Sequence, residues 1–204
     1  MNERASFPKY RWVILAIFMF ISVVIQIQWL THAAVARPAE MFYSGQFNPE
    51  GFFNIDFLAI SYMLVFIIMS FPASYIINKY GIKKSLIFGA ILAGFFSMTK
   101  AIFASDFNWI VVSQIGLAIA QPFILNSVTA VTVRWFPLKD RAMAAGLSSL
   151  AQYIGIVIAM LVTPMLIVSD PSLDGYGSGF DSNLIVHSVS EECLASLTCC
   201  SPVN

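Results

Sequence analysis

The chain has 204 residues, of which 58% are hydrophobic and 11% charged, and its eleven basic residues balance eleven acidic ones. A soluble domain carries about 25% charged residues, and the mean hydropathy here is +0.79. This composition excludes a disordered chain, a collagen-like fibre, a disulfide-dense secreted domain and a basic protein that binds nucleic acid. We therefore predict an all-α transmembrane protein whose first partner is the lipid bilayer.

Five apolar runs are each long enough to cross the membrane as a helix, which takes about 20 residues for about 30 Å of hydrocarbon. The predicted spans are 12–34, 55–77, 85–104, 108–133 and 142–168. Residues 1–11 precede the first span, a longer loop covers 35–54, and a polar tail covers 169–204. The predicted domains are thus a short amino-terminal segment, a five-helix transmembrane domain over 12–168, and the tail.

The basic residues predict the orientation of these spans. Nine of the eleven fall on one side of the predicted membrane, namely Arg4, Lys9, Arg11, Lys79, Lys83, Lys84, Arg134, Lys139 and Arg141. Because Lys and Arg concentrate in cytoplasmic loops, we expect a cytoplasmic N-terminus, an outward loop 35–54, and a multi-pass protein of the cell membrane. A cleaved signal peptide ending at Ala34-Val35-Ala36 is the alternative for the first run, but that run exceeds the usual apolar region of about 7–15 residues.

The predicted span interiors contain no Asp or Glu. Carboxylates in mid-membrane are the groups that usually bind the protons or sodium ions of coupled transporters. Their absence here argues against coupling of transport to an ion through a carboxylate. The spans also lack a nucleophile–base pair and a metal-ligand cluster, so we predict no enzyme, no metal and no cofactor. Asp56 is expected to cap the second span. Lys100, about one turn inside the outer end of the third span, is expected to reach back to the interface.

Neutral polar and aromatic residues cluster inside the spans instead. Gln28, Trp29 and His32 fall within about 100° of arc on the first span. Two interpretations stay open for such residues: hydrogen bonds between helices, or contacts with a ligand. Trp29 favours the ligand, because a Trp beside a Gln at this depth suits neither an interfacial belt nor tight helix packing.

The fourth span carries a similar stripe. Gln114, Gln121 and Thr132 share one face, because separations of seven and eleven residues nearly complete whole turns. Pro122 follows Gln121 and removes a backbone hydrogen bond, so we expect a kink there. A buried amide beside a weakened turn is a candidate contact for a ligand.

The connector over residues 72–84 resembles the signature loop of the major facilitator superfamily, which consists of a Gly, an Asp-Arg pair, a Gly and a basic pair. In this sequence Ser74 takes the place of the first Gly and Asn78 that of the Asp. The candidate gating-loop residues are Ser74, Asn78, Lys79, Gly81, Lys83 and Lys84.

Longer stretches are similar to the feline leukaemia virus subgroup C receptor-related transporters. They are Gln28-Trp29, Ile55-Asp56-Phe57-Leu58 with Tyr62-Met63, Phe71-Pro72-Ala73-Ser74, Ala120-Gln121-Pro122-Phe123-Ile124-Leu125-Asn126 and Arg134-Trp135-Phe136-Pro137. The resemblance runs in order through all five spans. It implies a twelve-helix, two-domain transporter with alternating access, of which this chain holds most of the N-terminal half.

The resemblance also implies candidate substrates and contacts. Animal members of that family are linked to choline, ethanolamine and haem. The family's cavity Trp matches Trp29 and its cavity Gln matches Gln121. A Trp face attracts a quaternary ammonium without any carboxylate, so a choline-like cation is favoured, whereas haem would find only His32. We expect substrate contacts first at Trp29 and Gln121, next at Gln28 and His32, and last at Gln114 and Asn126.

The tail over 169–204 differs from the rest of the chain. It has no apolar run that could span and no Lys or Arg, and it holds all three cysteines. It is interpreted either as an outward tail, with a disulfide, or as sequence foreign to the family, as after a frameshift. The sixth helix of the half is then absent, and we expect no transport without the missing C-terminal half. A non-transporting membrane subunit that pairs with a separate second half is the alternative.

Overall fold

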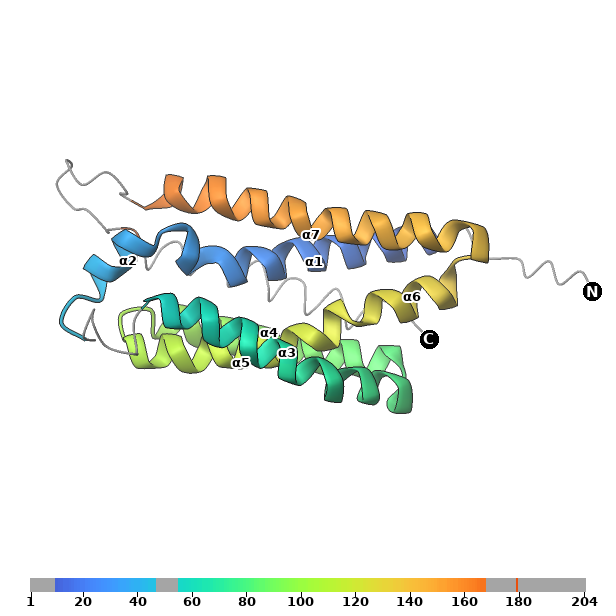
Figure 1. The fold of residues 1–204 in the computed structure, drawn as a ribbon, viewed down its shortest axis with the longest axis horizontal. Helices are drawn as coiled ribbons and strands as arrows, with labels where there is room; N and C mark the ends of the chain where they lie inside the picture. The colour runs from blue at the N-terminus through green and yellow to red at the C-terminus, as the bar shows by residue number, and fades with distance from the viewer. Residues whose placement is uncertain (1–9, 47–54, 168–178, 180–204) are drawn as a thin grey trace, which may run out of the picture.

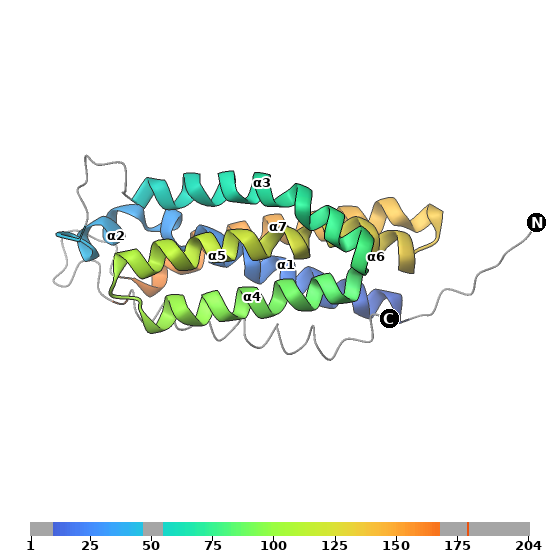
Figure 2. The same cartoon turned by 90° about the horizontal axis from the view of Figure 1, so that it is seen from below.

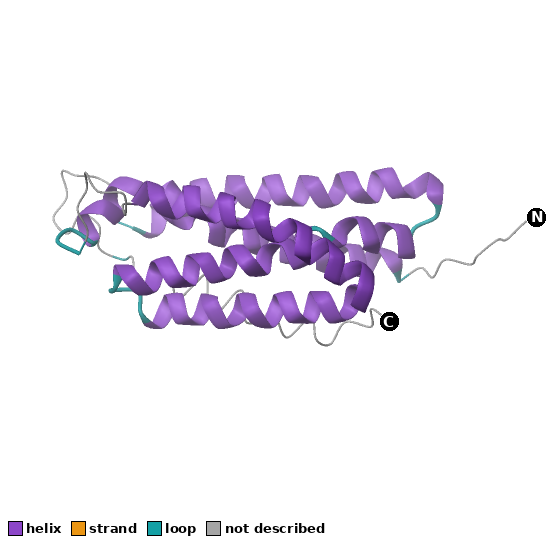
Figure 3. Cartoon of the chain, turned by 60° about the horizontal axis from the view of Figure 1, so that its bottom comes forward, coloured by secondary structure: helices purple, strands orange, loops and turns teal. Residues whose placement is uncertain are grey.

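The computed structural model describes residues 10–46, 55–167 and 179, and these contain helices and no strand (Figures 1 and 3). The helices are α1 Arg11–Ala34, α2 Ala36–Phe42, α3 Ile55–Tyr80, α4 Ile82–Ile102, α5 Phe107–Leu125, α6 Ser127–Trp135 and α7 Leu138–Leu166. Five segments are long and apolar enough to cross a membrane, with α5 and α6 together forming one of them. The predicted all-α fold with five spans is confirmed.

The spans form two groups, α1 with α7 and α3 with α4 and α5, and α1 also packs on α3 and α5 (Figures 1 and 2). The α1–α7 pair is close because α7 turns small buried residues towards α1, among them Ala144, Ser148, Ala151 and Gly155. A Cβ atom at Gly155 would lie 2.5 Å from the Val23 carbonyl oxygen of α1. Small residues let two helix backbones approach, which is how membrane helices gain packing contacts.

The bundle has two distinct ends, which we call the Gly81 end and the α2 end. At the first, α3 turns into α4 through Gly81, whose φ of +89° is costly for any residue with a Cβ atom. Basic residues gather at this end, and Arg11 of α1 forms an ion pair with Asp140 of α7 at 3.2 Å. That the Gly81 end faces the cytoplasm stays a prediction from the charges.

The structure adds detail at the α2 end. The loop predicted over 35–54 contains the helix α2, which carries Pro38 in its first turn, where a missing N–H is tolerated. Tyr43, just after α2, is fully buried and donates a hydrogen bond to the Ala104 carbonyl. Asp56 lies inside the first turn of α3, where a negative charge is favourable, and not at the N-cap where we expected it.

The fourth span is interrupted at Asn126, one turn after Pro122. The chain passes through Pro122 as helix, α5 ends at Leu125, and the Asn126 N–H donates to the Pro122 carbonyl at 3.0 Å. Because proline has no N–H, the turn around it is already weakened, and the change of direction is placed just beyond it. The third span begins at Ile82, earlier than predicted, because Gly81 alone makes the turn. The predictions for the tail cysteines fall outside the described residues.

Candidate functional site

A cavity of about 300 Å³ lies between α1, α3, α5 and α7, and we call it the aromatic cavity. Its lining residues come from all four helices: Gln26, Trp29, Tyr62, Met63, Phe66, Ile67, Gln121, Leu125 and Gln152. Trp29 and Gln121, the two residues ranked first from the sequence, therefore meet in one cavity.

Aromatic stacking shapes one wall of this cavity. The rings of Trp29 and Tyr62 are stacked with centroids 6.0 Å apart and an interplanar angle of 28°. On the other side, Gln26 donates to Gln152 at 3.4 Å and links α1 to α7. All lining residues are neutral, so the cavity offers ring faces and amide groups to a ligand and no formal charge.

A second polar group lies beside the cavity, nearer the α2 end, and we call Gln28, Ser97, Lys100 and Gln114 the Lys100 cluster. Gln28 Nε2 donates to Ser97 Oγ at 2.6 Å. Lys100 Nζ donates to Gln114 Oε1 at 3.0 Å and to the Gln28 carbonyl at 3.4 Å. Gln114 Nε2 reaches the Trp29 carbonyl at 3.5 Å. These bonds join α1, α4 and α5.

The expectation that Lys100 reaches the interface is wrong. Its side chain is 1% exposed and points into the bundle. The physical reason is that a carbonyl and an amide oxygen inside the bundle accept its hydrogen bonds, so the ammonium has acceptors without headgroup water. The sequence position of a lysine near a span end does not reveal which way round the helix it faces.

The remaining candidates divide between these groups. Gln28 and Gln114 belong to the Lys100 cluster, and His32 is buried on the same helix as Gln28; none of the three lines the aromatic cavity. For Gln28 and Gln114 the observed bonds are those of the helix-to-helix interpretation. Thr132 donates to the Thr129 carbonyl within its own helix at 2.9 Å.

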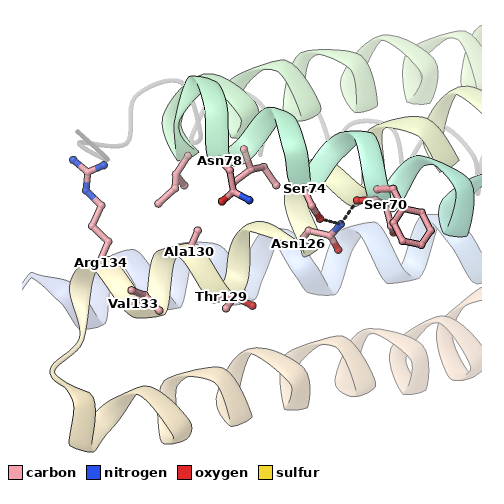
Figure 4. A pocket seen from close by; sticks show the side chains of 11 residues that line it. Ser70, Ser74, Asn78, Asn126, Thr129, Ala130, Val133 and Arg134 are labelled. Carbon is pink, nitrogen blue, oxygen red and sulfur yellow. Dashed lines mark hydrogen bonds between the residues drawn. The ribbon is translucent and has the colours of Figure 1, made fainter.

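Asn126 and part of the signature loop line a larger cavity at the Gly81 end, with a volume of about 850 Å³ (Figure 4). Asn126 Nδ2 donates to the Ser70 carbonyl at 3.2 Å and to Ser74 Oγ at 3.1 Å, which ties the break in the fourth span to α3. Asn78 and Arg134 also line it.

The basic residues of the signature loop lie apart from that cavity's lining. Lys79 Nζ sits 5.6 Å from the Tyr75 ring and 5.4 Å from the Tyr80 ring, within cation–π range. Lys83 and Lys84 belong to the first turn of α4. The loop residues therefore have different positions. Ser74 and Asn78 line the cavity, Gly81 makes the turn between α3 and α4, and the three lysines flank that turn.

Comparison with known proteins assigns the chain to a family, because the sequence profile of the Major Facilitator Superfamily matches residues 12–172. This chain belongs to the major facilitator superfamily. The match covers all five spans, and the superfamily predicted from the signature loop is confirmed.

Individual relatives of this superfamily chain are named as transporters. The uncharacterized MFS-type transporter C09D4.1 of Caenorhabditis elegans is 28% identical over 168 residues, which cover 81% of this chain and 28% of the relative. The choline/ethanolamine transporter flvcr2b of Danio rerio is 27% identical over 168 residues, which cover 81% of this chain and 34% of the relative. The chain thus spans about a third of the length of the curated relatives it matches.

A solved transporter structure shares the fold. The crystal structure of a bacterial homologue of the human lysosomal transporter Spinster, inward-facing and unoccupied, aligns with a TM-score of 0.71. The sequence identity is 15%, and the alignment covers 93% of this chain and 42% of that one. Five spans of this chain therefore adopt the arrangement found in part of that transporter.

Three residues that line the aromatic cavity, Tyr62, Gln26 and Gln152, were not among the predicted site residues. Tyr62 carried a usable signal, because it lies about as far from the α2 end on α3 as Trp29 lies on α1. Matching aromatic residues at equal depth on antiparallel spans would have found the pair. Gln26 and Gln152 meet only because α1 and α7 pack so closely at Gly155.

Proposed function

We propose that this chain forms most of the N-terminal half of a membrane transporter and that its aromatic cavity binds a choline-like cation. The observation that carries the proposal is Trp29, stacked on Tyr62 beside Gln121 on the wall of a neutral cavity. The names of the relatives, which include choline/ethanolamine transporters, support the same substrate class.

The chemistry of the lining suits a quaternary ammonium better than other cations. Such a group has no N–H to donate, so it needs no carboxylate and is held by aromatic ring faces within about 6 Å of the ring centroid. Because Trp29 and Tyr62 stack on each other, their inner faces are covered, and the stacked pair offers an outer ring face to the cation. An amide such as that of Gln121 can bond the hydroxyl group of choline, which gives the ligand an orientation.

The remaining half of the site is proposed to come from a C-terminal half that is not part of this chain. In transporters built from repeats the substrate lies near the bilayer midplane between the repeats, so this chain contacts the substrate from one side, which allows binding but no alternating access. We therefore propose that the chain acts in the cell membrane, N-terminus in the cytoplasm, and does not transport alone. Saturable uptake by the purified chain in liposomes would contradict this last point.

Binding of radiolabelled choline to the chain in lipid nanodiscs tests the substrate. We expect saturable binding that Trp29→Ala weakens at least about tenfold, while Trp29→Phe, which keeps a ring, weakens it less. Trp109→Ala is the matched control, because Trp109 stacks on Phe103 away from the cavity. Competition by the neutral isostere of choline, which has carbon in place of the nitrogen, distinguishes recognition of the positive charge from recognition of the shape. The proposal fails if the isostere competes as well as choline, or if no saturable binding occurs.

A further inference from the structure

We propose that Lys100 and Ser97 of α4 are positioning residues that fix the rotation of α1 and thereby aim Trp29 at Tyr62. Gln114 of α5 takes part as well, because it accepts a hydrogen bond from Lys100 and reaches the Trp29 carbonyl. The role of these residues in substrate binding rests on the proposed function, whereas their effect on the orientation of Trp29 does not.

Gln28 is held to α4 at two of its atoms. Its side chain donates to Ser97 at 2.6 Å, and its carbonyl accepts from Lys100 at 3.4 Å. Ser97 and Lys100 are three residues apart on α4 and so share one face, which bonds α1 at Gln28. Both bonds are made to Gln28 from one face of α4, so they restrain the rotation of α1 about its axis at the level of Gln28.

Trp29 follows Gln28 directly, so its side chain leaves α1 about 100° further round the helix. With Gln28 fixed on α4, that direction leads to α3, where Trp29 stacks on Tyr62. Gln114 adds a long contact of 3.5 Å to the Trp29 carbonyl. The position of one substrate-contact ring is therefore set by bonds made on a neighbouring face of α1.

A long side chain with a cationic, multiply donating head suits this position. The Lys100 ammonium has three donors on a long stem, so a single side chain from α4 reaches acceptors on both α1 and α5. An ionisable residue inside a membrane bundle is expensive, and such residues generally serve function. Packing at Gly155 holds α1 against α7, and the bonds of Lys100 add the polar contacts that hold Gln28 and so direct the Trp29 ring.

The experiment uses the full chain in nanodiscs, in a Trp12→Phe, Trp109→Phe, Trp135→Phe background that leaves Trp29 as the sole tryptophan. Quenching of Trp29 fluorescence by acrylamide, without ligand, reports how the ring is held. Choline affinity is measured on the same samples. The variants are Lys100→Met, Lys100→Arg and Ser97→Ala, and Lys139→Met is the control, since it removes one exposed charge at the Gly81 end.

Lys100→Met should raise the quenching constant at least about twofold and weaken choline binding about tenfold. Lys100→Arg, which keeps charge and donors, should return both values to within about twofold of the parent, and Ser97→Ala should move both in the direction of Lys100→Met by less. Lys139→Met should leave both unchanged.

Unchanged quenching in Lys100→Met and Ser97→Ala would overturn the proposal, as would a Lys100→Arg protein no better than Lys100→Met. Where Lys100→Met does not fold, Ser97→Ala decides. A parent that does not bind choline overturns the proposed function alone, because the quenching measurements still test the positioning of Trp29.

Discussion

The aromatic cavity and the Lys100 cluster draw glutamines from the same two helices and use them differently. Gln26 of α1 and Gln121 of α5 line the cavity, where Gln26 makes one long bond of 3.4 Å to Gln152, whereas Gln28 of α1 and Gln114 of α5 are bonded in the cluster at 2.6 and 3.0 Å. The difference comes from the third helix at each level. Where α4 offers Ser97 and Lys100, the amides become links between helices; where α3 offers an aromatic ring, space remains for a ligand.

The largest expected difference in the free energy of unfolding is between Gln114→Leu and Gln121→Leu. The first removes the 3.0 Å acceptor of a buried ammonium, so we expect a loss of about 2 kcal/mol in the free energy of unfolding. The second faces a cavity and should change that free energy by less than about 0.5 kcal/mol. Thermal unfolding in detergent measures both. Equal losses would mean that the two glutamines have the same structural role.

Gly155→Ala should come next, because its Cβ atom would lie 2.5 Å from the Val23 carbonyl oxygen. Pushing α7 from α1 would cost about 1–3 kcal/mol and open the cavity wall between Gln26 and Gln152. Gly146→Ala on the same helix is the control, since a Cβ atom there meets nothing within 4 Å. That control should keep or slightly raise stability through helix propensity. A stable Gly155→Ala protein would show that α1 and α7 can separate freely.

Tyr62→Leu tests the role of the aromatic pair in the cavity. Loss of the stacked ring should weaken choline binding about three- to tenfold, and because Tyr62 is buried it should also lower the free energy of unfolding by about 1–3 kcal/mol. Tyr62→Phe keeps the ring and should bind choline within about twofold of the parent. A large loss in Tyr62→Phe would instead assign the effect to the phenol hydroxyl.

Gln152→Ala should have the smallest effect. Its bond with Gln26 is 3.4 Å long and only partly buried, so we expect a change below about 0.5 kcal/mol in the free energy of unfolding. Choline affinity should fall by no more than about twofold. A larger fall would make Gln152 a direct substrate contact.

Much of this architecture follows from the sequence. The five spans are predictable because about 20 apolar residues have no other stable form in hydrocarbon, and Gly81 marks a turn that α3 and α4 share. Trp29 was identified because a Trp is unusual at its depth, and Gln121 because it shares a polar face with Gln114 and directly precedes Pro122. Their meeting in one cavity was suggested by the family resemblance and is seen in the fold.

The features that escaped prediction depend on how helices rotate against one another. The burial of Lys100 requires acceptors from two other helices, and helical periodicity within α4 alone does not reveal them. The helix α2 is too short for a periodic signal to stand out. Tyr62 looked like one aromatic residue among many on an apolar span until Trp29 was placed opposite it.

The break at Asn126 is held by a different partner from the helix that precedes it. Gln121 of α5 lines the aromatic cavity, whereas the Asn126 amide donates to Ser70 and Ser74 of α3 (Figure 4). The helix that carries Tyr62 is therefore fastened to the fourth span at the break itself, so the Tyr62 wall and the Gln121 wall of the cavity share one anchor.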